Sequence, residues 1–211
     1  MYLYGSLRSY IESASAGEPT PGGGSVAACA GALGVSMACM AANFTVGRKK
    51  FRDVEDSVKR HLAVCVNARD EMMALIDEDV KAYAAVSAAY GMPGGTPAEK
   101  TARSGAIQKA LVAAMQPPLR TIRSAREALR AIRALAEVAN PNLISDVGVA
   151  ALLTEAALRA AKLNVEINLK SLDDPSLVAS TRSEIDEAAR EAAQLAQETL
   201  ARVNRLVGGT P

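Results

Sequence analysis

The sequence predicts an all-α protein, a single-domain bundle of about five to six long helices over residues 1–211. Alanine is abundant and β-branched residues are sparse, a composition that favours helix. Apolar residues recur at three- and four-residue steps over long stretches. No stretch alternates with the two-residue period of a strand, and no long polar linker divides the chain. Together these observations predict one helical domain.

The first half of the chain should hold three helices. A short amphipathic helix covers about residues 3–15, and a loop over residues 17–24 follows it. The next helix begins at Ser25 and runs to about Val46, with Gly47 as its C-terminal cap. Gly31 and Gly34 would weaken this helix, so we expect another helix to approach it closely there. A long helix then covers residues 53–90.

Capping signals mark the helices of the second half. Thr96 and Glu99 form a capping box around Pro97, and that helix should reach about residue 138 with a kink at residues 117–118, which are both proline. An Asn-Pro pair at residues 140–141 precedes a helix over residues 145–169. Asp173, Asp174 and Pro175 cap the last helix, which runs to about residue 206.

Composition argues against several classes of protein. A net charge of +1 and an aromatic content of 3% do not suit a nucleic-acid binder. Three cysteines without a C-x-x-C pair, and a single histidine at His61, argue against a disulfide framework and a metal site. Residues 19–47 carry no charge and resemble a membrane span, but their small side chains suit a packed core helix. We therefore expect a cytoplasmic protein with no membrane segment and no metal.

A glycine-rich turn before a helix is the first candidate site. Pro21, Gly22, Gly23, Gly24 and Ser25 let the backbone approach a ligand, and the helix start favours a phosphate or carboxylate. The alternative is a flexible loop with a helix cap. The turn matches neither a Walker loop nor a dinucleotide fingerprint.

Charged residues supply two more candidates. Arg48 and Lys49 follow an apolar helix, where they could bind an anion or simply complement the negative helix end. Asp77 and Asp79 interrupt an otherwise apolar helix, with Tyr83 four residues after Asp79 on the same face. A carboxyl group among apolar side chains has a raised pKa and can exchange protons near neutrality, unless this is a solvated acidic patch.

Polar residues near the fourth long helix form the last candidate. Asn164 and Asn168 share one helix face although Asn is a poor helix former, which indicates polar recognition or hydrogen bonding between helices. Ser145 and Asp146 stand near the start of that helix.

These motifs together resemble the cyclodeaminase domain of formiminotransferase-cyclodeaminase and its stand-alone bacterial relatives, which include methenyltetrahydrofolate cyclohydrolase. The resemblance keeps its order and spacing over nearly the whole chain. The matching stretches are residues 19–25, 45–51, 77–83, 96–100, 118–119, 142–146, 164–169 and 172–174.

The resemblance implies an all-helical homodimer that acts on the one-carbon unit of tetrahydrofolate, a substrate that often carries a polyglutamate tail, without a metal or organic cofactor. The reaction would be formiminotetrahydrofolate cyclodeamination or methenyltetrahydrofolate cyclohydrolysis. The family's catalytic carboxylate falls on Asp79, and Asp77 is the second candidate. The glycine-rich turn with Arg48 and Lys49 would bind the glutamate tail. The pterin or the dimer-facing wall would be lined by Ser145, Asp146, Asn164 and Asn168.

One departure from the family stands out. Gly94 and Gly95 replace a Lys-Asn pair that is common before the capping box. A substrate contact made by that lysine would be lost here. This change is also the only support for the alternative function, a non-catalytic folate-binding or scaffold protein.

Overall fold

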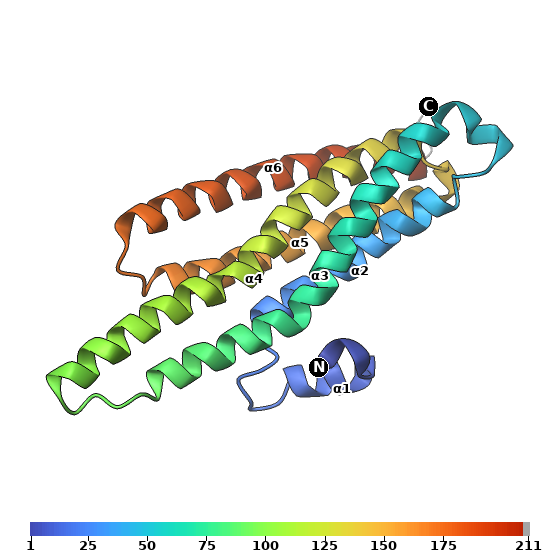
Figure 1. The fold of residues 1–211 in the computed structure, drawn as a ribbon. Helices are drawn as coiled ribbons and strands as arrows, with labels where there is room; N and C mark the ends of the chain where they lie inside the picture. The colour runs from blue at the N-terminus through green and yellow to red at the C-terminus, as the bar shows by residue number, and fades with distance from the viewer. Residues whose placement is uncertain (209–211) are drawn as a thin grey trace.

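The chain forms one elongated bundle of helices (Figure 1). A computed structural model describes residues 1–208, and within them all regular structure is helical. Five long α-helices make up the bundle: α2 (Gly23–Asn43), α3 (Glu55–Tyr90), α4 (Pro97–Val138), α5 (Ile144–Leu169) and α6 (Pro175–Val207). A short helix α1 (Leu7–Ala14) and three 3₁₀ turns, at Tyr2–Tyr4, Lys49–Val54 and Pro141–Leu143, complete the described chain. The predicted all-α fold is confirmed.

Helix α2 packs against α3 and α5. Its small residues permit this close approach: a Cβ atom at Gly31 would lie 2.5 Å from Sδ of Met72, and one at Gly34 would lie 2.8 Å from Cβ of Leu153. Helix α2 is long and apolar enough to cross a bilayer, yet 61% of its most apolar stretch is buried inside the bundle. The predicted close approach at the two glycines is confirmed.

Helices α2 and α5 run antiparallel. Gly23, at the start of α2, faces Asn164 near the end of α5, whereas Gly34 faces Thr154 in the middle of α5. At the other end, the backbone N–H of Asn140 donates to Oγ1 of Thr45 at 2.8 Å, which attaches the α4–α5 connection to the end of α2. The two ends of α2 therefore lie in different surroundings, about 30 Å apart along its 21 residues.

Local capping signals were predicted correctly, but the ends of α2 were not. Thr96 and Glu99 form the reciprocal capping box, and Asp174 accepts from the N–H groups of Ser176 and Leu177. Helix α2, in contrast, begins at Gly23 with Gly22 as its N-cap, so Ser25 lies inside the first turn and its side chain caps nothing. The helix also ends at Asn43, before Gly47.

The segment after α2 shows why that helix ends early. Oγ1 of Thr45 donates to the carbonyl of Ala41 at 2.8 Å. Gly47 lies in the loop that follows, where its φ of +76° is a left-handed conformation that glycine adopts without strain. Gly47 therefore turns the chain toward the Lys49–Val54 turn and does not cap the helix. Helix α4 continues through Pro117 and Pro118. The kink expected at this proline pair stays a prediction.

Candidate active site

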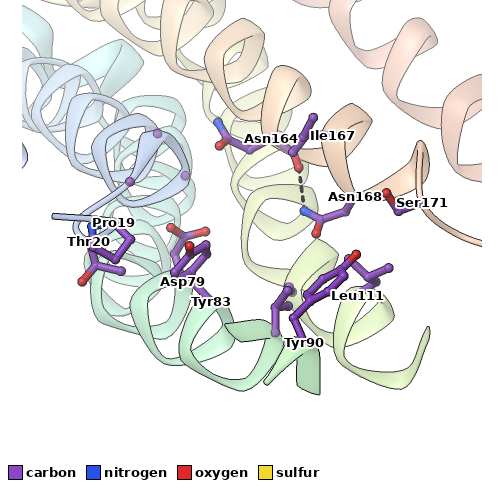
Figure 2. A pocket seen from close by; sticks show the side chains of 15 residues that line it. Pro19, Thr20, Asp79, Tyr83, Tyr90, Leu111, Asn164, Ile167, Asn168 and Ser171 are labelled. Carbon is purple, nitrogen blue, oxygen red and sulfur yellow. Dashed lines mark hydrogen bonds between the residues drawn. The ribbon is translucent and has the colours of Figure 1, made fainter. Parts of the chain in front are cut away.

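A pocket of about 360 Å³ opens where the glycine-rich turn meets α3, α4 and α5 (Figure 2). Its lining residues come from four segments that are distant in sequence. They are Pro19, Thr20, Gly22, Gly23, Gly24, Asp79, Tyr83, Val86, Tyr90, Leu111, Ala114, Asn164, Ile167, Asn168 and Ser171. Asp79 is the one ionisable acid or base in this set, apart from the two tyrosines. The pocket is thus a largely apolar cleft with a single carboxylate.

The Asp79 carboxylate caps α2 from outside that helix. Gly22 occupies the N-cap position and has no side chain, so the first N–H groups of α2 need another acceptor. Oδ2 of Asp79 accepts from the Ser25 N–H at 2.9 Å. The anion held at this helix start is therefore the protein's own carboxylate.

Burial raises the pKa of the Asp79 carboxyl group, and the Ser25 N–H lowers it by a smaller amount. No basic side chain lines the pocket to stabilise the charged form. Loss of solvation disfavours a carboxylate, so the group binds a proton more readily than an ordinary aspartate. A carboxyl group of this kind is a stronger base than an ordinary aspartate and can both accept and return a proton.

Gly24 makes room for this carboxylate. A Cβ atom at Gly24 would lie 2.6 Å from Cγ of Asp79 and 2.8 Å from its Oδ2. These distances are well below van der Waals contact, and the obstruction is a short side chain fixed by its bond to Ser25. A glycine is therefore required here for close approach of the helix start to Asp79.

Two amide side chains lie across the pocket from Asp79 (Figure 2). Nδ2 of Asn164 donates to the carbonyl of Ala160 at 2.9 Å, and Nδ2 of Asn168 donates to the carbonyl of Asn164 at 2.8 Å. Each amide therefore uses its donor on its own helix, one turn back. The amide oxygens remain as acceptors that can receive N–H groups from a ligand in the pocket.

Tyr83 and Tyr90 form an aromatic side of the pocket that sequence reasoning did not assign to substrate binding. Their side chains are 45% and 46% exposed, and both line the cavity. Asp79, Tyr83 and Tyr90 follow one another at helical spacing on α3, so they share a face about 16 Å long. The four-residue step from Asp79 to Tyr83 was the available signal; Tyr90 had none.

Asp77 lies outside the pocket. It is buried, with 7% of its surface exposed, and its Oδ1 accepts from the backbone N–H of Tyr2 at 2.6 Å. The side chain thus holds the N-terminal segment against α3. Of the two candidate carboxylates, only Asp79 faces the cavity.

The other predicted site residues fall into two groups. Pro21 and Ser25 are buried beside the pocket, next to the turn that lines it. Arg48 and Lys49 are exposed just beyond the far end of α2, and Ser145 and Asp146 stand at the start of α5 at that same end. Within one chain these four residues lie about 30 Å from the pocket, because the whole of α2 separates them.

No group of three or more His, Cys, Asp or Glu residues is placed to hold a metal ion within residues 1–208. Cys39 and Cys65 are buried and Cys29 is half-buried, all as free thiols.

Known proteins resemble this chain over nearly its whole length. A model of the formiminotransferase-cyclodeaminase family matches residues 6–206. Methenyltetrahydrofolate cyclohydrolase of Methylorubrum extorquens is 39% identical over 90% of this chain and 91% of its own length. Rat formimidoyltransferase-cyclodeaminase is 34% identical over 90% of this chain, which corresponds to 35% of that longer protein.

A solved structure shares the whole fold. The crystal structure of formiminotetrahydrofolate cyclodeaminase from Thermotoga maritima superposes with a TM-score of 0.78 at 31% identity. The superposition covers 97% of this chain and 96% of the other. The fold, the extent of the family match and the identity over nearly the full length lead to one conclusion: the chain belongs to the formiminotransferase-cyclodeaminase family.

Proposed function

We propose that this chain is an enzyme of folate one-carbon metabolism that uses Asp79 to move protons at the one-carbon unit of tetrahydrofolate. The observation that carries the proposal is a carboxyl group of raised pKa, facing a cavity without a basic side chain. The similarity to a cyclohydrolase and to cyclodeaminases over most of the chain supports the substrate class.

The first reaction we propose is cyclohydrolysis of 5,10-methenyltetrahydrofolate. The relative named as a cyclohydrolase is 39% identical, against 34% and 31% for the rat and Thermotoga cyclodeaminases. The Asp79 carboxylate takes a proton from water as its oxygen adds to the methenyl carbon. The bond from that carbon to N5 then breaks, N5 takes the proton from Asp79, and the hydroxyl proton leaves to solvent. The product is 10-formyltetrahydrofolate, with one proton released.

The second candidate is cyclodeamination, which the likeness to the Thermotoga cyclodeaminase favours. N10 of 5-formiminotetrahydrofolate, whose formimino group is protonated as an amidinium, attacks the formimino carbon and loses its proton to Asp79. The departing nitrogen takes that proton and leaves as ammonia, so that the 5,10-methenyl bridge remains. Both reactions require one group that accepts a proton and then returns it, and neither needs a metal or an organic cofactor.

The pocket is suited to a flat, polar ring system. Tyr83 and Tyr90 present aromatic surface on α3, and Asn164 and Asn168 present amide oxygens on α5. Aromatic side chains stack on planar rings, while amide oxygens accept from ring N–H groups. We place the pterin and its neighbouring ring between these two sides, with the one-carbon unit at Asp79.

A homodimer would account for the exposed apolar face of α2 and α5. Leu33 of α2 is 55% exposed, and Leu163 and Ile167 of α5 are 72% and 63% exposed. A second copy could cover these side chains about a twofold axis perpendicular to the bundle. The end of its bundle that carries Arg48 and Lys49 would then approach the Asp79 pocket of the first copy. In that arrangement Arg48 and Lys49 could still bind the glutamate tail, with Ser145 and Asp146 beside them.

One assay tests the proposed function. Purified protein is given 5,10-methenyltetrahydrofolate or, separately, 5-formiminotetrahydrofolate, while methenyl absorbance is followed. We expect absorbance to fall faster than the uncatalysed rate with the first substrate if the chain is a cyclohydrolase, and to rise with the second if it is a cyclodeaminase. A rate equal to the uncatalysed one with both substrates would reject the proposed function.

A further inference from the structure

The N-terminal segment contacts the glycine-rich turn through Tyr10, a residue that does not line the pocket. The hydroxyl of Tyr10, on α1, lies 3.0 Å from Oγ of Ser25, and both side chains are buried. The N–H of the same Ser25 donates to Asp79. Ser25 therefore links Tyr10 to the Asp79 carboxylate: its hydroxyl bonds to Tyr10, and its main-chain N–H bonds to Asp79.

Tyr10 is itself held in place by Tyr2. The two rings meet edge to face, with centroids 5.5 Å apart and planes at 74°. The Tyr2 backbone N–H donates to Asp77, and its hydroxyl donates to the carbonyl of Thr20 at 3.3 Å. The segment is thus attached both to α3, two residues before Asp79, and to the glycine-rich turn.

We propose that Tyr10 is a positioning residue for Asp79: by hydrogen bonding to the Ser25 hydroxyl, it keeps that hydroxyl away from the carboxylate. The inference rests on the proposed role of Asp79 as the proton acceptor and donor. Tyr10 does not line the pocket, so it acts through Ser25 and not on the substrate.

The physical reason is the number of donors that Asp79 receives. A carboxylate with more hydrogen-bond donors has a lower pKa and is a weaker base. Ser25 is fully buried, so its hydroxyl, if it lost Tyr10, would need another partner. Asp79 is the acceptor already bonded to the main chain of that residue. With the Ser25 hydroxyl donating to the Tyr10 hydroxyl, its proton does not reach Asp79, and Ser25 gives the carboxylate a single N–H bond.

The surroundings of Asp79 leave few other groups to set its protonation. The N-terminal segment contributes Tyr10 and Tyr2, α2 contributes Cys29 beside Tyr10, and α3 contributes Asp77 and Tyr83. Helix α5 adds the uncharged amide of Asn164, and α4 adds only Leu111 and Ala114. Burial raises the pKa of Tyr10, so its hydroxyl stays protonated and remains a hydrogen-bonding group in the working pH range.

The test is the pH dependence of turnover in Tyr10→Phe, with the substrate that the wild-type protein converts. We expect kcat to fall by about three- to tenfold, KM to change little, and the acidic limb of the profile to move to lower pH. Tyr4→Phe is the matched control, since Tyr4 is 82% exposed and should keep the wild-type profile. A Tyr10→Phe variant that is less stable but has an unshifted acidic limb would show a merely structural role and overturn the proposal.

Ser25→Ala provides an independent check, because it removes the hydroxyl but keeps the N–H that bonds to Asp79. We expect its acidic limb not to move to lower pH, and adding Tyr10→Phe to it should produce no further shift. A downward shift in Ser25→Ala alone, or an equal effect of Tyr10→Phe in both backgrounds, would overturn the proposal even if Tyr10→Phe folds poorly. Wild-type turnover in Asp79→Asn would instead reject the proposed function itself.

Discussion

Carboxylates are held in opposite ways on two faces of this bundle. Along the contact between α4 and α6, four arginines of α4 pair with four glutamates of α6. These are Arg123, Arg126, Arg130 and Arg133 with Glu184, Glu187, Glu191 and Glu198. We call this set the α4–α6 ladder. Glu191 illustrates it: bonds from Arg130, then from Arg126, lower the pKa of its carboxyl group.

In the pocket, Asp79 has no cation and a single N–H donor, and burial raises the pKa of its carboxyl group. The ladder carboxylates are paired with arginines and join α4 to α6. Asp79 has no such partner among the described residues, and its carboxyl group binds a proton more readily than an ordinary aspartate. The difference is our reason for assigning the proposed proton transfer to Asp79 and not to the many paired carboxylates.

The largest expected effect is that of Asp79→Asn. Asn can still accept from the Ser25 N–H but cannot exchange a proton, so we expect kcat to fall by about 10²–10⁴-fold. Affinity for the folate should stay within about tenfold, a window of ~1.4 kcal/mol. Turnover followed by methenyl absorbance, with binding measured separately, checks both. Near-normal turnover would reject Asp79 as the acid/base, and the difference between Asp79 and the ladder carboxylates would then have no functional meaning.

Gly24→Ala should come next, because its new methyl group would push directly against Asp79. A displacement of about 1 Å at the reacting group can cost roughly 10²-fold in rate. Gly105→Ala is the matched control: it lies in α4, and nothing stands within 4 Å of its added Cβ. We expect Gly105→Ala to keep full activity and gain up to about 1 kcal/mol of stability. Equal activity in the two variants would show that close approach to Asp79 is unimportant.

Asp77→Asn should have a small effect on turnover, below about threefold, since the Asn oxygen can still accept from the Tyr2 N–H. Comparing Asp77→Asn with Asp79→Asn distinguishes the effect of losing the carboxylate that holds the N-terminal segment from the effect of losing the one at the pocket. Steady-state rates decide the matter. A loss as large as that of Asp79→Asn would restore Asp77 as the catalytic candidate.

The smallest effect on activity is expected in the ladder. Arg126→Met removes the partner of Glu187 and one partner of Glu191, yet it should leave kcat and KM unchanged. Partly exposed ion pairs contribute about 1 kcal/mol or less, so we expect the melting temperature to fall by about 2–4 °C at low salt and less at high salt. Thermal unfolding at two salt concentrations measures this. A change in kcat would mean that the ladder affects the pocket.

Predictions from the sequence succeeded where the signal is local. Thr96 and Glu99 lie three residues apart, so their capping box could be predicted directly, and the same holds for Asp174. The start of α2 was predicted two residues late because its cap comes from Asp79, 54 residues away in sequence. Capping rules consider only the side chains of Gly22 and its neighbours in sequence, so they cannot identify an acceptor that another helix supplies.

The candidate site residues predicted from the sequence come together only in part. Asp79, Gly22–24, Asn164 and Asn168 line one pocket. Arg48 and Lys49 were assigned to the same glutamate tail as the glycine-rich turn, but the length of α2 separates them from that turn. Their binding role stays a prediction. Tyr10 was missed because its one polar contact depends on how α1 folds back onto α2.

The most direct test of the central claim is the pH dependence of kcat/KM for the wild-type protein, corrected for the uncatalysed rate, with Asp79→Asn measured in parallel. This profile reports ionisation of the free enzyme. If Asp79 acts as the base, we expect activity to fall with decreasing pH, with a midpoint above the ordinary aspartate pKa, and we expect that limb to be absent in the residual rate of Asp79→Asn. A midpoint at or below the ordinary aspartate value, or the same limb in both proteins, would contradict the account.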